Sequence, residues 1–290
     1  MIDGYYLGCP IWSNKAWVGE LFTLDAKASD FLRQYGRVFN TVEGNTSFYA
    51  VPPVNSVAAW ADQAPADFRF CFKIPRAITH DRRLQNAEAE SELFFQRMAP
   101  LGERLGPFLV QLPPSLGPQE WPVLTSFLVR LPPQYRYAVE VRHPDFFGAG
   151  EAEARLDQFL QDLGMDRVLF DSRPLRAADR SDPNVRRAQQ RKPDLPVHPV
   201  ALGPHPLVRY IADPNLPAND PWLREWAQRV AAWIEAGRQP FVFLHAPDDF
   251  YAPRLARRFH QLLSDHVDVG RLPPWPADEA PSSAEQLSLF

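Results

Sequence analysis

The stretch YAVEVRHPDFFGAGEAEARLDQFLQDLGMDRVLFDSR, residues 137–173, decides the fold class. It opens with a short β-rich run from Tyr137, and residues 151–164 then predict a helix. A second β-rich run follows from Arg167. A strand, a helix and another strand in this order are typical of parallel strands joined by a crossover helix.

The same alternation extends along the chain in both directions, and several strand runs are apolar on both faces, as buried parallel strands are. The other six predicted strands begin at Tyr5, Val38, Phe68, Phe108, Leu207 and Phe241. The other predicted helices cover residues 26–36, 54–63, 87–106, 118–131, 221–237 and 252–266. Eight strands, nearly all followed by a helix, predict an α/β fold: a single (β/α)8 TIM-barrel-like domain over residues 1–270. A doubly wound open sheet is the alternative, but the first turn has no G-x-G-x-x-G.

Two segments depart from this alternation. A long insert, residues 175–206, separates the sixth and seventh predicted strands, and loops of this length are often functional. The insert and its approach are basic; the cations are Arg173, Arg176, Arg180, Arg186, Arg187, Arg191 and Lys192. After Gly270 the sequence becomes rich in Pro, Ala, Ser and Glu, which predicts a flexible tail over residues 271–290.

Composition limits the functional classes. Apolar residues make up 45% of the 290 residues, enough for a sizeable core. The net charge is 31 − 35 = −4, so any surface that binds nucleic acid must be local. Cys9 and Cys71 alone give neither a disulfide framework nor a cysteine-based zinc site. No signal peptide and no apolar run of about 18 residues is evident, which predicts a cytoplasmic protein without a membrane partner.

Candidate functional residues follow from the barrel prediction, because function in such folds collects at the carboxyl ends of the strands. The candidate catalytic residues are Glu43, Lys73, Glu140, His143, Asp171 and His245. The candidate substrate-binding residues are Trp12, Asn45, Tyr49, His80, Gln111, Arg142, Arg173 and Arg209. A carboxylate near a lysine predicts a general base, and a histidine an acid. The alternative is a layer of ion pairs, because buried charge is costly unless it is paired.

The sequence indicates the identity of the ligand less clearly than the position of the site. Several candidates are suitable ligand types for a divalent metal, but no H-x-H, H-E-x-x-H or cysteine pair supplies a spacing signal. The basic insert favours a phosphate backbone. Trp12, Trp17 and Tyr49 are candidates for stacking on bases, although the two tryptophans could equally close one end of the barrel.

Several motifs resemble a known family. They are FNTVEGNTSFYAVPP, FRFCFKIPRAITH, VEVRHPDFF, DSRP and RKPDLPVHPV. They are similar to the YecE-like bacterial proteins, domain of unknown function family seventy-two, over nearly the whole chain. The resemblance implies a TIM-barrel-like fold without an established activity, comparable to the endonuclease IV fold, which acts on DNA with metals. By motif it implies functional positions at Trp12, Glu43, Asn45, Tyr49, Lys73, His80, Glu140, Arg142, His143, Asp171 and Arg209.

The chain ends in QLSLF, residues 286–290, which resembles the Q-L-x-L-F peptide that binds the bacterial DNA sliding clamp. In peptide-in-groove recognition, Gln286 would hydrogen-bond at the groove edge while Leu287, Leu289 and Phe290 fill apolar pockets. The alternative is that these side chains pack on the outside of the barrel.

Three functional hypotheses remain open. The first is a barrel that binds nucleic acid or another phosphate ligand and cuts a phosphoester, as a metal-assisted, nuclease-like hydrolase would. The second is a non-catalytic adaptor in DNA maintenance. The third is a barrel enzyme that acts on a small sugar phosphate.

Overall fold

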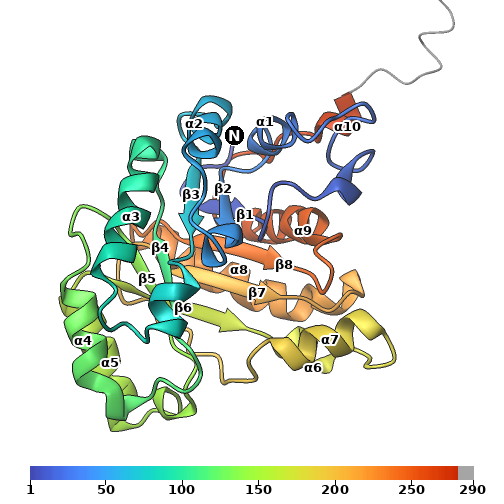
Figure 1. Cartoon of the computed structure of the whole chain (residues 1–290). Helices are drawn as coiled ribbons and strands as arrows, with labels where there is room; N and C mark the ends of the chain where they lie inside the picture. Colours follow the sequence, from blue (N-terminus) through green and yellow to red (C-terminus); the bar gives the residue numbers. More distant parts are fainter. Residues whose placement is uncertain (280–290) are drawn as a thin grey trace, which may run out of the picture.

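The computed structural model describes residues 1–279, which form an α/β fold with two parallel sheets (Figure 1). A curled six-stranded sheet has the order β1-β8-β7-β6-β5-β4. Its strands are β1 Tyr6–Gly8, β4 Phe108–Gln111, β5 Tyr137–Glu140, β6 Asp166–Asp171, β7 Leu207–Ile211 and β8 Phe241–His245. The second sheet pairs β2 (Thr41–Gly44) with β3 (Arg69–Phe72). All eight predicted strands are present, each within or next to its predicted run.

Backbone hydrogen bonds link the two sheets along both of their edges. The Glu43 amide donates to the Cys9 carbonyl at 3.1 Å, which joins β2 to the end of β1. The Ile74 amide donates to the Leu109 carbonyl at 3.0 Å, which joins the end of β3 to β4. A Cβ at Gly8 would lie 2.1 Å from the Thr41 carbonyl oxygen, so only glycine permits this approach of β1 to β2. Strands that are consecutive in the chain are therefore neighbours in space, and within residues 1–279 there is no switch point as in a doubly wound sheet.

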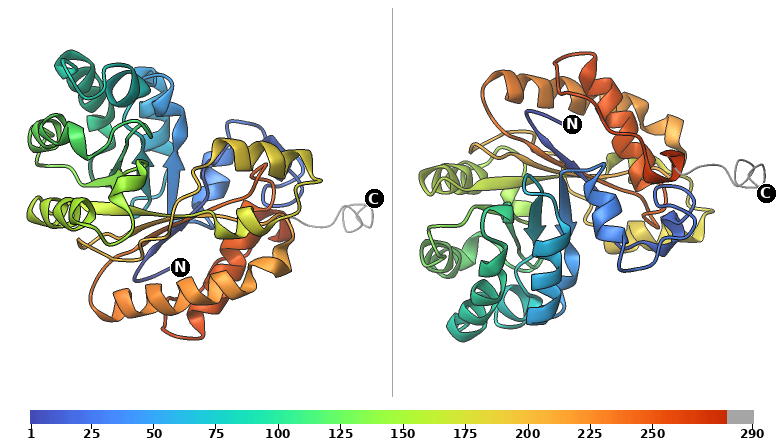
Figure 2. Two further views of the ribbon diagram at one scale, coloured as in Figure 1. Left: turned by 90° about the horizontal axis from the view of Figure 1, so that it is seen from below. Right: turned by 90° about the horizontal axis from the view of Figure 1, so that it is seen from above.

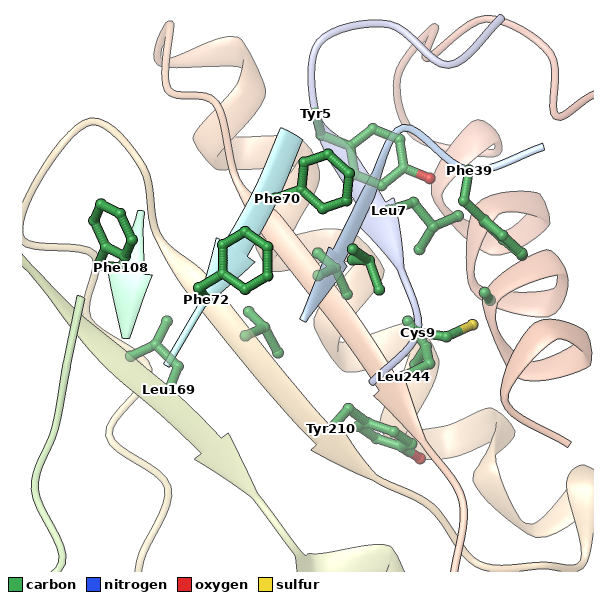
Figure 3. Packing of buried hydrophobic residues seen from close by; sticks show 14 of the residues in the cluster. Tyr5, Leu7, Cys9, Phe39, Phe70, Phe72, Phe108, Leu169, Tyr210 and Leu244 are labelled. Atoms are coloured by element: carbon green, nitrogen blue, oxygen red, sulfur yellow. The ribbon is translucent and has the colours of Figure 1, made fainter. Parts of the chain in front are cut away.

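Helices surround the strands, as the two views of Figure 2 show. The main ones are α1 Phe31–Gly36, α2 Val54–Gln63, α3 Glu88–Met98, α4 Trp121–Val129, α5 Glu151–Asp162, α8 Asp220–Glu235 and α9 Ala252–Ser264. Their apolar residues recur at helical spacing and are buried; Leu255, Phe259 and Leu262 on α9 are an example. The largest apolar cluster fills the layer between strands and helices, including Leu7, Phe70 and Leu244 (Figure 3).

A second, smaller cluster consists of side chains on the opposite faces of the strands. It contains Cys71, Leu109, Ala138, Val168, Leu207, Phe241 and Phe243. Because strand side chains alternate between faces, the residue two positions further along each strand shares the face of its apolar neighbour. On five of the strands this next residue is polar, namely Lys73, Gln111, Glu140, Arg209 or His245, and all five are buried. On β6 it is the half-buried Phe170. An apolar layer thus lies beneath a polar layer at the carboxyl ends of the strands.

Two segments that were predicted to be irregular contain helices. The insert after β6 begins with α6 (Arg173–Ala177) and continues with α7 (Pro183–Arg191). The Asp182 carboxylate caps α7 by accepting a hydrogen bond from the Asn184 amide at 2.7 Å. The capping signal of Asp182 followed by Pro183 was present in the sequence, but a low apolar content concealed the helix.

The folded domain extends beyond the predicted boundary at residue 270. Trp275 is buried at 5% exposure, and α10 (Pro276–Glu279) follows it. The guanidinium of Arg257 on α9 lies 3.6 Å from the centroid of the Trp275 ring. The Ala277 amide donates to the Leu21 carbonyl at 3.3 Å. Residues 271–279 therefore pack on the domain.

The predicted partner-binding residues Gln286, Leu287, Leu289 and Phe290 lie outside the described residues. Within residues 1–279, no helix has the length and apolar content needed to cross a bilayer.

Candidate functional site

Arg209 lies in the middle of the polar layer. It joins the six-stranded sheet to the two-stranded sheet. Its guanidinium donates two hydrogen bonds of 2.8 Å to the carboxylate of Glu43 on β2. A third bond goes to the carboxylate of Glu140 on β5. Arg209 itself lies on β7 and is 2% exposed. Planar, bidentate pairing of this kind is the strongest geometry available to arginine.

Both carboxylates have further cationic or hydrogen-bonding neighbours. Glu43 accepts a hydrogen bond from His245 Nε2 at 3.1 Å and lies 3.4 Å from Lys73 Nζ. Glu140 accepts a hydrogen bond from Arg142 Nε at 2.7 Å, and Arg142 donates in turn to Gln111 Oε1 at 2.8 Å. The polar layer is therefore a connected network that matches the ion-pair interpretation of these residues.

This pairing fixes the charge of the two carboxylates. Burial alone would raise the pKa of Glu43, but the charges of Arg209 and Lys73 outweigh burial and hold that pKa well below its usual range. Burial opposes the same effect at Glu140, where Arg142 and Arg209 lower the pKa to about 2. Both groups are ionised at neutral pH and already fully engaged, so their role is to position the cations around them.

The nitrogen bases of the network are shifted toward their neutral forms. Burial lowers the pKa of His245 to about 4, despite the neighbouring Glu43 carboxylate. Burial and the nearby Arg142 lower the pKa of His80 to about 4 as well. At Lys73, burial and the charge of Arg209 lower the pKa to about 7, although Glu43 opposes them. Lys73 is thus the group of this network whose charge changes near neutral pH.

A cavity of about 510 Å³ opens above the network at the carboxyl ends of the strands. Its polar lining is dominated by positive charge. Seven cationic side chains line it: Lys73, Arg76, Arg142, Arg187, Arg191, Lys192 and Arg209. Asp249 is the single carboxylate among its described lining residues. Electropositive clefts of this kind concentrate anions.

Helix α7 and the residue after it contribute three of these cations, Arg187, Arg191 and Lys192. No salt bridge within residues 1–279 involves any of the three. The predicted basic flap is therefore located at the mouth, where its charge is available to a ligand. In contrast, Arg173 and Arg176 pair with acidic side chains, Arg173 with Asp171 at 2.8 Å and Arg176 with Asp194 at 3.6 Å.

Asp249 was not among the candidate residues, although it follows β8 in a loop at the mouth. It has a left-handed φ of 60°, a conformation that is uncommon for residues other than glycine. The buried Trp17 fixes this loop by donating from Nε1 to the Asp249 and Phe250 carbonyls at 3.1 and 3.0 Å. Burial raises the pKa of Asp249 to about 6, despite the opposing charge of Lys192. Strained backbone held by its surroundings often marks a functional position.

Most predicted substrate-binding residues are brought together at this cavity. Asn45, Tyr49, His80, Gln111, Arg142 and Arg209 line it. Tyr49 is 80% exposed, so its aromatic side chain is available at the rim. Asn45 donates to the Pro10 carbonyl at 3.0 Å, which fixes the loop after β1 against the loop after β2.

Six predicted site residues are outside the described cavity lining: Glu43 and Glu140 belong to the network beneath it, and the other four are Trp12, His143, Asp171 and Arg173. Trp12 packs edge-on against Trp60 and Phe70, with ring centroids 5.3 and 5.9 Å apart. His143 accepts a hydrogen bond from the Asp145 amide at 3.3 Å, at the start of a short helical turn. Asp171 is buried and accepts hydrogen bonds from Arg173 and from Trp226 Nε1, both at 2.8 Å. Strand position alone could not show that these four side chains point toward helices and loops.

The mouth does not fit a divalent metal. A cation bound by Glu43 or Glu140 would have to displace Arg209, which already pairs with both carboxylates. Among residues 1–279, the one cluster with metal-ligand geometry is Glu153, Asp157 and His198, outside the cavity lining. The Arg167 guanidinium occupies that cluster at 3.2 Å from Glu153 and 2.9 Å from Asp157. The donor sets therefore favour internal cations over metal ions.

The fold and the site define a class: an α/β protein of parallel strands with a cationic mouth over a buried ion-pair network. The chain belongs to the family described as "Protein of unknown function DUF72", whose model matches residues 6–280. This confirms the predicted resemblance.

Individual relatives agree with this assignment. The chain is 40% identical over 286 residues to the UPF0759 protein YecE of Escherichia coli strain K12, covering 98% of this chain and 99% of that protein. It is similar in fold to a DUF72 protein of Thermotoga maritima, with a TM-score of 0.68, 22% identity and coverage of 90% and 99%. A DUF72 protein of Enterococcus faecalis gives a TM-score of 0.67, 17% identity and coverage of 93% and 98%. At these identities the structures support the fold alone.

Proposed function

We propose that the cavity at the strand ends binds a phosphate-bearing ligand, and that nucleic acid is its preferred class. The observation that carries this proposal is the lining of seven cations with one carboxylate. Arginine matches the bidentate geometry of phosphate, and a network that fixes Arg209 and Arg142 in advance lowers the entropy cost of binding.

Two features favour nucleic acid over a small phosphate ester. The cations of α7 extend the positive lining from the network outward, as a phosphate backbone requires. The exposed ring of Tyr49 lies at the same rim and offers a face on which a base can stack. A sugar phosphate would need only the inner cations, and it remains the second candidate because the cavity is large enough to hold one.

We infer further that the two sheets close into a (β/α)8 barrel around this cavity. The hydrogen bonds between β1 and β2 and between β3 and β4 support closure. The network supports it too, because Arg209 from one sheet pairs with Glu43 from the other. We propose binding without metal-assisted hydrolysis, since the mouth carboxylates are engaged by guanidinium groups.

The test is salt-dependent binding of a fluorescent single-stranded oligonucleotide. Each phosphate contact adds about 0.7 to the slope of log K against log salt for single strands. The double variant Arg187→Gln/Arg191→Gln should therefore flatten the slope by about 1.4 if each arginine makes one contact. Arg186→Gln is the matched control, because Arg186 lies on α7 outside the described cavity lining.

The outcomes separate the candidates. No oligonucleotide binding at low salt, together with binding of inorganic phosphate or a sugar phosphate, would select the small-molecule alternative. Absence of binding in every arm would overturn the proposal. Equal slopes of log K against log salt for the double variant and the control would show that α7 does not contact the oligonucleotide. Binding without turnover would favour the non-catalytic adaptor.

We also propose that Gln286, Leu287, Leu289 and Phe290 bind the bacterial sliding clamp. The support is the sequence QLSLF at residues 286–290, after the described residues 1–279. Short apolar anchors around a hydrogen-bonding glutamine suit recognition in a groove. Together with the cationic mouth, this motif favours a role at DNA over one in metabolism.

A further inference from the structure

Lys73 differs from Arg142 and Arg209, the two guanidiniums of the network, in how its charge is balanced. The network contains five charged groups. They are the carboxylates of Glu43 and Glu140, the guanidiniums of Arg142 and Arg209, and the Lys73 amine. The two guanidiniums already neutralise the two carboxylates. Lys73 can therefore lose its proton without leaving a buried charge unpaired.

The contacts of Lys73 are consistent with this count. Its distance of 3.4 Å to Glu43 Oε1 is longer than the 2.8 Å bonds that Arg209 makes to the same carboxylate. The Lys73 side chain is 9% exposed, yet it lines the cavity. The Nζ atom lies over the ring of Phe48, 5.9 Å from its centroid. The amine is thus poorly solvated and still within reach of a ligand.

Hydrogen bonds on both sides hold the backbone of Lys73 in place. The Ser47 hydroxyl donates a hydrogen bond to the Lys73 carbonyl at 2.7 Å. The following amide, of Ile74, donates to Leu109 on β4, so this part of the backbone is held from the β2 side by Ser47 and from the other side by β4. A nucleophile that is held in place loses little entropy when it attacks a bound group.

We propose that Lys73 is a nucleophile that forms an imine with an aldehyde carried by the phosphate-bearing ligand of the mouth. The ligand class is an open-chain sugar phosphate, either free or as the ring-opened abasic sugar in DNA. This inference rests on the proposed function, because the surrounding arginines would hold the ligand through its phosphate. Desolvated lysines beside other cations are the form of this residue that attacks carbonyl groups.

The step balances without a redox partner. The neutral amine attacks the aldehyde carbon, a C–N bond forms, and the carbonyl π electrons move to the oxygen. Nitrogen loses a proton and oxygen gains one, which gives a carbinolamine. Loss of water from the carbinolamine then gives the C=N bond. Amine and aldehyde thus become imine and water, and hydrolysis reverses the step.

Lys73 has the basicity that this step needs. Burial and the charge of Arg209 lower its pKa to about 7, so the neutral amine is well populated at physiological pH. An exposed lysine, with a pKa of about 10.4, is almost wholly protonated there.

The experiment is borohydride trapping on the full-length protein. The probes are an oligonucleotide with one abasic site, glyceraldehyde 3-phosphate, and glyceraldehyde as the aldehyde without phosphate. Intact mass and peptide mapping locate the reduced adduct. We expect an adduct at Lys73 with the phosphate-bearing probes in excess over glyceraldehyde, with a trapping rate that rises with pH through about 7. The stronger of the two phosphate arms identifies the source of the aldehyde.

Two variants and a control complete the test. Lys73→Arg keeps a cation and Lys73→Gln removes it; both should lose the adduct, and circular dichroism checks that each is folded. Lys27→Arg, at an exposed lysine outside the described cavity lining, should trap as the unaltered protein does. Oligonucleotide or phosphate binding without an adduct at Lys73 would overturn the imine but leave the proposed function standing. If binding also failed, both the imine inference and the proposed function would be wrong. An adduct of equal yield in Lys73→Arg would place the reaction elsewhere and overturn the inference.

Discussion

At the scale of single residues, Arg209 has the greatest effect on the site. It donates hydrogen bonds to two buried carboxylates, and it places positive charge at the floor of the cavity. The same side chain lowers the pKa of Lys73. One buried guanidinium therefore supports the structure, the anion preference and the nucleophile at once.

A first prediction concerns Glu43. Glu43→Gln should reduce the free energy of unfolding by about 3–5 kcal/mol, because it leaves buried cations without their counter-charge. Urea unfolding measures the change. Glu88→Gln is the matched control: Glu88 pairs with Arg130 on the surface, where such pairs contribute about 0–1 kcal/mol. Equal stability of the two variants would contradict the central role of the network.

The pH dependence of DNA binding provides a second prediction. Because burial raises the pKa of Asp249 to about 6, this carboxyl loses its charge as the pH falls through that value. The cavity then repels phosphate less, so affinity for an oligonucleotide should rise. His80 and His245, with pKa values of about 4, stay neutral in this range. Asp249→Asn should remove the change near pH 6 and keep the one that Lys73 causes near pH 7.

The control for this prediction is Asp248→Asn. Asp248 is exposed, adjacent in sequence and outside the described cavity lining. Phosphodiesters do not titrate in this range, so an oligonucleotide reports on the protein alone. If Asp249→Asn and the unaltered protein showed the same dependence of oligonucleotide affinity on pH between pH 5 and pH 8, the charge of Asp249 would have no effect on binding.

At the scale of elements, the strands could be predicted from the sequence, but the helical structure of the insert after β6 could not. All eight strands carry short β-rich runs, and the main helices carry apolar residues at helical spacing, so local pattern was sufficient. Helix α7 has only Val185, Ala188 and Gln189 buried, and its charged surface looked like a loop. The segment 271–279 was predicted as tail because its Pro and Ala content hides one anchoring residue, Trp275.

A third prediction tests that segment. Trp275→Ala should cost about 3–5 kcal/mol of unfolding free energy, as large buried aromatics do. Trp275→Phe should cost much less, because it keeps a ring against Arg257 and removes an indole N–H that has no hydrogen-bond partner within the described residues. Thermal or urea unfolding measures both. Full stability of Trp275→Ala would show that the domain does end near residue 270.

At the scale of the whole molecule, charge is distributed unevenly. The net charge is −4, yet seven cations surround one cavity, so the positive potential is concentrated at the strand ends. An acidic remainder disfavours nonspecific contact with nucleic acid elsewhere on the surface. The proposed clamp motif is separate from this cavity in the sequence, at residues 286–290.

A fourth prediction separates these two locations. Deletion of residues 286–290 should abolish capture of the protein by immobilised bacterial sliding clamp and leave oligonucleotide affinity unchanged. Arg187→Gln/Arg191→Gln should do the reverse. A scrambled tail of equal composition controls for nonspecific apolar binding. Capture that survives the deletion would contradict the proposed motif.

The sequence by itself determined which residues form strands and helices, and which polar side chains stand at the strand ends. Both are local properties: the first follows from periodicity, and the second from alternation of side chains along a strand. Tertiary structure decided which charges pair. Arg209 and Glu43 are separated by 166 residues in the chain, and only the meeting of the two sheets brings them together. It also decided that His143 and Asp171 face away from the cavity while Lys192 and Asp249 line it. Desolvation and the field of paired charges depend on that packing, so no local pattern could reveal the shifted pKa of Lys73.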